Sequence, residues 1–271
     1  MMIQNQIAVV TGATGGIGRA ITTMLAERGA AAVAVVDLAE NCHTVAEDIN
    51  RAVDRDVAVG FDGDVSDSAF RKHVFSEMKS RFGTVTVCVP AAGILRDALA
   101  VKFDRERGIA QMYDEDVFRQ VLDVNLIHPV YWSIETIAGI VEERAQSDRG
   151  RWNPDEPISG SIVMIGSVSS RGNRGQISYS SAKSALNGAC KTLNLEGMYH
   201  GVQCKIVHPG MVNTPMVEQM PDGYFEEHIK HQIPLGRMID PSEIASAVAA
   251  LIENPIISGA LWADGAMMPM S

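Results

Sequence analysis

"TGATGGIG", residues Thr11–Gly18, follows an apolar, β-branched run, Ile7–Val10, close to the start of the chain. Glycine has no Cβ, so a loop rich in it can turn sharply or bring backbone amides close to another molecule. Two interpretations are open: a plain tight turn, or a loop whose amides bind a phosphate. In a strand, loop and helix unit, Gly12 would permit the turn, Gly16 would let the backbone approach a pyrophosphate, and Gly18 would let the helix pack against the strand.

The next apolar run favours the phosphate interpretation. "VAVVD" ends in Asp37, about 20 residues beyond the loop, where a carboxylate can accept hydrogen bonds from an adenosine ribose. A 2′-phosphate at that place would meet a negative charge, and neither Gly15 in the loop nor Leu38 after Asp37 supplies a cation. These residues predict NAD as the cofactor rather than NADP. The alternative for Asp37 is an ordinary strand-end or helix-capping carboxylate.

Composition limits the other possibilities. With 271 residues, 46% of them hydrophobic, the chain suffices for one well-buried domain, so we predict that residues 1–271 form a single domain. A net charge of -10 without a basic cluster disfavours nucleic acid and anionic membranes as partners. No apolar run approaches the roughly 20 residues of a membrane helix, and the first residues lack the basic start and long apolar core that are typical of a signal peptide, so we expect a cytoplasmic protein. The cysteines lack metal-ligand spacing, which predicts reduced thiols and no metal site; they are Cys42, Cys88, Cys190 and Cys204.

The order of apolar runs and helical segments predicts the fold class. Strand-like runs alternate with segments of helical period, which is typical of an α/β, Rossmann-type, doubly wound parallel sheet with helices on both faces. Seven strands are expected, at Ile7–Val10, Val33–Val36, Val57–Phe61, Val85–Val89, Ser161–Ile165, Cys204–His208 and Leu261–Ala263. One helix should begin within the glycine loop and end near Gly29, and another should begin at Asp240, with Pro241 in its first turn and Glu243 reaching back.

Two stretches interrupt this alternation. Val101–Asp116 is charged and has no clear period, and Glu143–Ser159 is rich in Asp, Arg, Pro and Gly. Both are interpreted as surface insertions, which could shape the entrance of a site or an oligomer surface.

The residues after the fifth strand could do chemistry. "MIGSVSS" contains Ser167, and "YSSAK" follows with Tyr179 and Lys183 four residues apart, which on a helix places the phenol and the ammonium on one face. A free tyrosine has a pKa of about 10, and a neighbouring cation lowers it, so Lys183 could make Tyr179 a working acid/base. Ser167 could then hydrogen-bond the substrate oxygen. Taken alone, the tyrosine and lysine pair is also common on exposed helices.

The motifs together resemble the short-chain dehydrogenase/reductase family over nearly the whole chain. Those that carry the resemblance are Thr11-Gly12-x-x-x-Gly16-Ile17-Gly18, Asp64-Val65, Asn125 in "DVNLI", Ser167, Tyr179-x-x-x-Lys183 and "PGMVNT" at Pro209–Thr214. The interval from Gly12 to Gly16 is similar to that of the compact members, the 3-oxoacyl-reductase-like and alcohol dehydrogenase branch, rather than the extended ones.

The resemblance implies a role for each matching residue. Tyr179 would be the catalytic acid/base, Ser167 would orient the substrate oxygen, and both would contact the substrate. Lys183 would bind the nicotinamide ribose and lower the tyrosine pKa, while Asn125 would hold a water on a proton path. The expected cofactor-binding residues are Gly12, Thr14, Gly15, Gly16, Ile17, Gly18, Asp37, Leu38, Asp64, Val65, Ala91, Ala92, Gly93, Tyr179, Lys183, Pro209, Val212 and Thr214.

Three departures from the family pattern concern single positions. Where many members have Asn-Asn-Ala-Gly, this chain has Pro90-Ala91-Ala92-Gly93, so only backbone contacts carry over there. The segment between Ser167 and Tyr179 is one residue shorter than in many members, and Ser169 and Ser170 lie close by as alternatives to Ser167, which we favour because it directly follows the strand. His208 stands where a small residue is usual, either as a strand-end histidine with satisfied hydrogen bonds, which we favour, or as a substrate contact.

The expected activity is NAD-dependent hydride transfer between a secondary alcohol and a ketone. One alternative is a reductase of 3-oxoacyl thioesters, on acyl carrier protein or coenzyme A, or the reverse 3-hydroxyacyl dehydrogenase; another, of a different class, is a protein that senses NAD without turnover. The resemblance further implies a homotetramer or homodimer and a substrate lid at residues 214–236. In that lid Met216, Met220, Tyr224 and Phe225 would cover the substrate or pack a short helical pair.

Overall fold

The computed structural model describes residues 1–215, 217, 223 and 225–267. Within them, seven strands form one parallel sheet in the order β3-β2-β1-β4-β7-β8-β9, which confirms the predicted Rossmann-type fold. Every predicted strand is present within a few residues of its expected bounds. The strands are β1 (Ile7–Thr11), β2 (Ala32–Asp37), β3 (Ala58–Asp62), β4 (Val87–Pro90), β7 (Gly160–Ile165), β8 (Val202–Pro209) and β9 (Ala260–Ala263).

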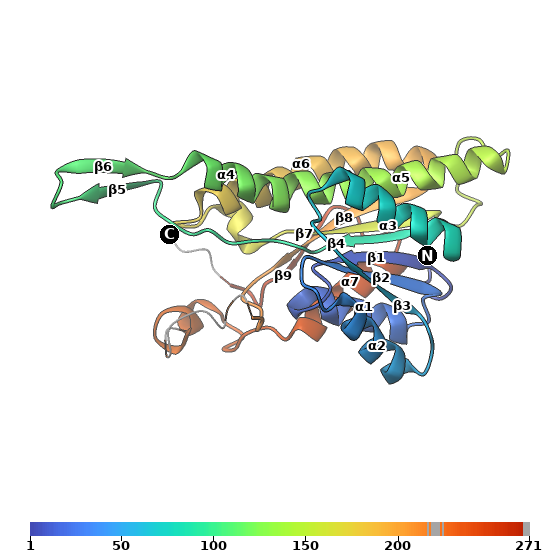
Figure 1. The fold of residues 1–271 in the computed structure, drawn as a ribbon, viewed down its shortest axis with the longest axis horizontal. Coiled ribbons are helices and arrows are strands. Elements are labelled where there is room, and N and C mark those ends of the chain that lie inside the picture. Colours follow the sequence, from blue (N-terminus) through green and yellow to red (C-terminus); the bar gives the residue numbers. More distant parts are fainter. Residues whose placement is uncertain (216, 218–222, 224, 268–271) are drawn as a thin grey trace.

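Helices cover both faces of this sheet (Figure 1). One face carries α1 (Gly16–Glu27), α2 (Cys42–Val53) and α7 (Pro241–Glu253), and the other carries α3 (Ser68–Arg81), α4 (Glu115–Leu122), α5 (His128–Gln146) and α6 (Ile177–Gly197). The shorter helices are η1 (Asp123–Ile127), η2 (Val168–Arg171), η3 (Met198–His200), η4 (Phe225–Ile229) and η5 (Lys230–Gln232). Two clusters of buried apolar side chains, one on each face, form the core.

Local sequence signals set the ends of the predicted helices. A side chain at Gly18 would collide with the carbonyl of Gly12, so α1 can pack this closely on β1 only with glycine there. At the start of α7, Asp240 accepts a hydrogen bond from the Ser242 amide, and Glu243 accepts one from the Asp240 amide, each at 2.8 Å. This is the expected capping box.

Other sequence expectations concern cysteines, metals and membranes. All four cysteines are free, as expected, and all four are buried. Among the described residues, no cluster of three or more His, Cys, Asp or Glu side chains is placed to hold a metal ion. None of the helices in the described part of the chain has the length and apolar character needed to cross a membrane.

The first predicted insertion is a β-hairpin that the sequence did not reveal. Antiparallel strands β5 (Val101–Asp104) and β6 (Ile109–Met112) project from the body at the end where the parallel strands finish (Figure 1). Their side chains are mostly exposed on both faces, so no burial imposes an alternation of apolar and polar residues that would predict strands. At the hairpin's base, the Ala98 amide donates to the Gly175 carbonyl at 2.9 Å, just before α6.

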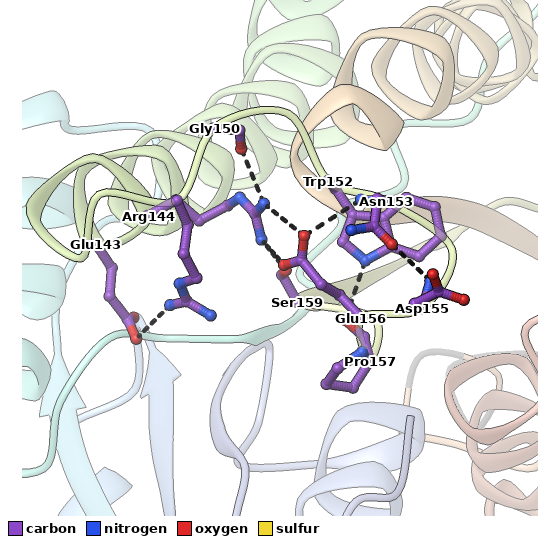
Figure 2. Close-up of polar contacts among 10 residues, drawn as sticks. Glu143, Arg144, Gly150, Trp152, Asn153, Asp155, Glu156, Pro157 and Ser159 are labelled. Atoms are coloured by element: carbon purple, nitrogen blue, oxygen red, sulfur yellow. Dashed lines mark hydrogen bonds and ion pairs between the residues drawn. The ribbon is translucent and has the colours of Figure 1, made fainter.

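The second insertion is a loop anchored by a buried arginine, as Figure 2 shows. The Arg144 guanidinium, near the end of α5, donates to the Glu156 carboxylate at 2.8 Å, to Ser159 Oγ at 3.3 Å and to the Gly150 carbonyl at 2.8 Å. Ser159 directly precedes β7, so this loop lies at the amino ends of the parallel strands, opposite the hairpin (Figure 1). It therefore has no part in an entrance at the carboxyl ends.

Candidate active site

A cavity of about 420 Å³ lies at the carboxyl ends of β1 to β4. Doubly wound sheets bind their ligands at this edge. Its lining consists of Gly12, Thr14, Gly15, Gly16, Ile17, Gly18, Asp37, Leu38, Asp64, Val65, Ala91, Ala92, Gly93, Ile94, Val124, Thr214 and Pro215. Most of the predicted cofactor residues are therefore brought together in one cavity. Ile94, Val124 and Pro215 were missed, although each directly follows or precedes a predicted site residue.

The glycine loop offers unpaired amides to this cavity. The first N–H groups of an α-helix have no partner within the helix, and no side chain caps those of α1. Gly16 has φ +50°, a conformation that favours glycine, and a Cβ at Gly15 would meet nothing within 4 Å. Open space beside unpaired amides at the positive end of a helix dipole fits a pyrophosphate.

Asp37 is oriented by the same loop. Its Oδ2 accepts hydrogen bonds from the Thr14 amide at 3.1 Å and the Thr14 hydroxyl at 2.7 Å, and its Oδ1 accepts one from the Leu38 amide at 2.8 Å. A carboxylate has about four acceptor positions, so about one remains for a ribose hydroxyl. The carboxylate therefore ties β2 to the loop and still fits the predicted contact with an adenosine ribose.

A buried histidine supports the loop that follows β4. The Ala92 amide donates to Thr11 Oγ1 at 3.1 Å, and Thr11 Oγ1 lies 2.9 Å from His128 Nε2. His128 Nδ1 lies 3.0 Å from the Val124 carbonyl, which can only accept, so Nε2 is the acceptor and the Thr11 hydroxyl donates to it. Burial lowers the pKa of His128 to about 3, which keeps the ring neutral. This network holds the backbone at Ala92, in the segment Pro90–Gly93, which has no asparagine where many family members have two.

Asn125 lies in η1, a π-helical turn between α4 and α5. Such turns often occur at functional sites because they redirect one side chain out of the helical ladder. The Asn125 side chain is buried, donates to the Ile94 carbonyl at 2.9 Å and accepts from the Ile94 amide at 3.1 Å. A Cβ placed on Gly93 would lie 2.7 Å from Asn125 Oδ1 and 4.0 Å from Lys183 Nζ. The glycine thus brings the amide and the ammonium close to one point at the cavity wall.

Lys183 and Tyr179 lie on α6, as the spacing predicts. The Lys183 ammonium donates to the Ile165 carbonyl at 2.8 Å and lies 5.6 Å from the centroid of the Tyr179 ring. Burial lowers the pKa of Lys183 to about 8. Burial also raises the pKa of Tyr179 to about 12, the hydrogen bond with Ser167 opposing this shift and the charge of Asp97 adding to it. The pKa of Tyr179 is therefore raised and not lowered as expected, because desolvation outweighs the hydrogen bond with Ser167, and Lys183 is not among the causes of the shift.

Of the three neighbouring serines, Ser167 is the one that reaches Tyr179. It directly follows β7 and Gly166, and its Oγ also accepts a hydrogen bond from the Ser169 amide at 3.1 Å. Ser169 is buried, and Ser170 Oγ lies 3.5 Å from His208 Nδ1. Both nitrogens of His208 have protein partners, as our favoured interpretation expects. These contacts connect Ser167 to Tyr179, Tyr179 to Lys183, and Lys183 to Asn125 near Gly93, although none of the four predicted catalytic residues is among those that line the cavity.

The predicted residues after β8 are spread around the site. Pro209 ends β8, Val212 is buried and forms a bridge with Ile239, and only Thr214 lines the cavity. The predicted lid at 214–236 is described only in part. Met216, Met220 and Tyr224 lie outside the described residues, while Phe225 opens η4 and is half-buried.

Comparisons with known proteins agree with this geometry. The sequence model of the short chain dehydrogenase family matches residues 6–224. A 3-oxoacyl-[acyl-carrier-protein] reductase of Homo sapiens is 29% identical over 265 residues, which cover 97% of this chain and 98% of that protein. Carbonyl reductase family member 4 of Danio rerio is 31% identical over 265 residues, with the same two coverages. The 3-oxoacyl-[acyl-carrier-protein] reductase FabG of Escherichia coli (strain K12) is 32% identical over 255 residues, covering 94% of this chain and 92% of its own.

Proposed function

Because the chain belongs to the short-chain dehydrogenase family of oxidoreductases, we propose that it interconverts a secondary alcohol and a ketone with NAD as its cofactor. One observation carries the proposal: Tyr179 contacts Ser167 and lies on the same helix as Lys183, which with Asn125 lies close to Gly93 in the wall of the cavity that the glycine loop lines. When bound, NAD would supply the hydride acceptor or donor.

The chain's own residues would handle the proton and the substrate oxygen. Ser167 would hydrogen-bond the substrate oxygen, and Tyr179 would give its proton to that oxygen in reduction or take it in oxidation. Burial raises the pKa of Tyr179 to about 12, so the phenol is protonated at neutral pH and suited to donate. Oxidation requires the phenolate, which positive charge near the ring favours. The Lys183 ammonium is the chain's own source of that charge.

The Tyr179→Phe variant tests this assignment because it removes the phenolic proton and keeps the ring. We expect kcat to fall by about 10³-fold, within the range of lost acid/base catalysis. The dissociation constant for NAD and the melting temperature should stay near the wild-type values. Tyr199→Phe is the matched control, since Tyr199 is 53% exposed and follows the far end of α6. Wild-type turnover by Tyr179→Phe on an identified substrate would contradict the proposal.

A second candidate substrate class follows from the relatives. Two of the proteins reported above are 3-oxoacyl-[acyl-carrier-protein] reductases by name, so a 3-oxoacyl thioester fits at least as well as a simple ketone. A panel of secondary alcohols, their ketones and acetoacetyl thioesters, each with NAD and NADP and followed by cofactor absorbance, separates these classes. NAD binding measured by calorimetry without turnover on the whole panel would favour the sensing alternative.

We also retain the proposals of a homotetramer or homodimer, of a cytoplasmic location and of a substrate lid at residues 214–236. Apolar side chains exposed on α5 and α6 support assembly, and they include Tyr131, Ile134 and Leu195. Light scattering of the purified protein gives the mass of the assembly and tests the first of these proposals.

A further inference from the structure

Ser167 is held through its own backbone by a buried imidazole. Its amide donates a hydrogen bond to Nδ1 of His208 at 3.1 Å, and its carbonyl oxygen lies 3.1 Å from the same nitrogen. His208 lies on β8, next to the strand that ends before Ser167, and its side chain is fully buried. It is absent from the lining of the cofactor cavity. The imidazole therefore contacts the serine and not the cofactor site.

The partners of His208 determine its tautomer. The Asn187 side-chain nitrogen donates to the Ser184 carbonyl at 3.2 Å, so the Asn187 Oδ1 faces the imidazole and needs a donor at Nε2. Nδ1 is then without a proton and accepts from the Ser167 amide. The proton of the neutral ring is then on Nε2, which lies 3.0 Å from Asn187 Oδ1 on α6. Asn187, by accepting from Nε2, keeps Nδ1 available to Ser167.

The ring has little freedom to move. It stacks on the Trp262 indole of β9, with ring centroids 4.2 Å apart and planes at 16°, and the Arg171 guanidinium lies 3.7 Å from the centroid of the same indole. A Cβ at position 166 would collide with the imidazole, so Gly166 makes room for it. The imidazole is thus enclosed by Gly166 and Ser167, which follow β7, by Trp262 of β9 and by Asn187 of α6.

We propose that His208 is a positioning residue for Ser167, holding the serine backbone so that its hydroxyl points at Tyr179. This inference rests on the proposed function, because it assigns Ser167 to the substrate oxygen. In its neutral form the ring accepts from the Ser167 amide, and Asn187 maintains that form.

Protonation would reverse the contact. A protonated Nδ1 would donate to the Ser167 carbonyl and leave the Ser167 amide without its acceptor. Burial lowers the pKa of His208; the Ser167 carbonyl opposes this shift, and the charges of Arg171 on η2 and Lys183 on α6 add to it. Strands β7 and β9 carry no titratable side chain. A decrease of kcat on the acid side, below the usual range of histidine, should therefore report this ring.

Two substitutions at His208 separate positioning from packing. His208→Leu removes the acceptor, and we expect kcat to fall by about 10- to 100-fold, as for a small misplacement of a reacting group. His208→Asn can place its amide oxygen near the Nδ1 position and cannot be protonated in this range. Its kcat should be within about threefold of the wild-type value, since the Ser167 amide again has an acceptor. The decrease of kcat at acid pH should be absent from this variant. Both should bind NAD with unchanged affinity.

Asn187→Asp provides an independent test because it leaves His208 in place. A carboxylate next to Nε2 stabilises the imidazolium, so the decrease of kcat on the acid side should occur at a pH higher by about one unit or more. The melting temperature of each variant shows whether it folds. If His208→Leu does not fold, His208→Asn and Asn187→Asp still test the proposal.

The outcomes distinguish this inference from the proposed function. If Tyr179→Phe loses turnover but His208→Leu keeps wild-type kcat and pH profile, the positioning role is wrong and the proposed function stands. If Tyr179→Phe keeps turnover, the proposed function fails first. Nitrogen NMR of histidine-labelled wild-type protein needs no substrate: we expect the proton of His208 on Nε2, and a proton on Nδ1 at neutral pH would overturn the inference.

Discussion

At the scale of single residues, the site depends on side chains that hold other site residues in place through hydrogen bonds. Asp37 binds Thr14 of the glycine loop, the Thr11 hydroxyl links His128 to the Ala92 amide, and His208 accepts from Ser167. Each of these bonds joins segments far apart in the sequence. Such hydrogen bonds hold the residues that would contact the cofactor and the substrate in position before either molecule binds.

The choice between NAD and NADP belongs to this scale, and Asp37→Asn tests it. The substitution keeps the shape but removes the negative charge, so we expect NAD to bind about tenfold more weakly and NADP to bind more tightly than to wild type. Thr14→Val is the control, because it removes one hydrogen bond of Asp37 without changing the charge, and it should leave the ratio of the two affinities unchanged. Calorimetry with both cofactors measures this. Tighter binding of NADP than NAD by the wild type would refute the assignment.

At the scale of elements, the two insertions differ in where they lie on the sheet and in how they are anchored to it. The hairpin of β5 and β6 lies at the site end of the sheet, while the loop before β7 lies at the other end and is anchored by Arg144. Arg144 is 2% exposed and its partner Glu156 is 27% exposed, so the guanidinium depends on protein acceptors for most of its hydrogen bonds.

Arg144→Met tests the anchoring of this loop. The substitution leaves the Gly150 carbonyl, Ser159 and Glu156 without their donor, so we expect the melting temperature to fall by roughly 5 °C. The kcat should not change, because the loop lies at the amino ends of the strands. Arg149→Met is the matched control: its ion pair with Glu143 spans 3.7 Å, and both side chains are 47% exposed, so little change is expected. Equal losses in the two variants would contradict the interpretation.

At the scale of the whole molecule, the sheet order decides what meets at the site. Because β1 lies between β2 and β4, and β7 lies between β4 and β8, residues that are distant in the sequence end side by side at one edge. The cavity forms over the carboxyl ends of β1 to β4, and proposed catalytic side chains lie after β7 and on α6.

The hairpin provides a prediction at this scale. Apart from hydrogen bonds within the hairpin and at its base, no hydrogen bond or ion pair among the described residues joins 101–112 to the body, and none of these residues lines the cavity. Replacing residues 102–111 by a short glycine and serine turn should therefore preserve the circular dichroism spectrum and the affinity for NAD. Loss of NAD binding in the shortened protein would show that the hairpin belongs to the site.

Much of the fold could be predicted because it depends on local signals. Apolar β-branched runs mark the strands, the glycine loop marks the start of α1, and Asp240 marks the start of α7. The hairpin could not be predicted, because strands exposed on both faces carry no pattern of burial. The raised pKa of Tyr179 could not be predicted either, since it depends on desolvation by residues from other elements.

The sequence by itself determined the type of sheet, the glycine loop and the residue types available for chemistry, because each of these follows from spacing along a few neighbouring residues. Only the tertiary structure decided that His208 contacts Ser167, that His128 supports the segment at Ala92, and that the two insertions lie at opposite ends of the sheet. The physical reason is the order of the strands in the sheet. It brings residues from different strands and helices within hydrogen-bonding distance, and no local pattern specifies those pairs.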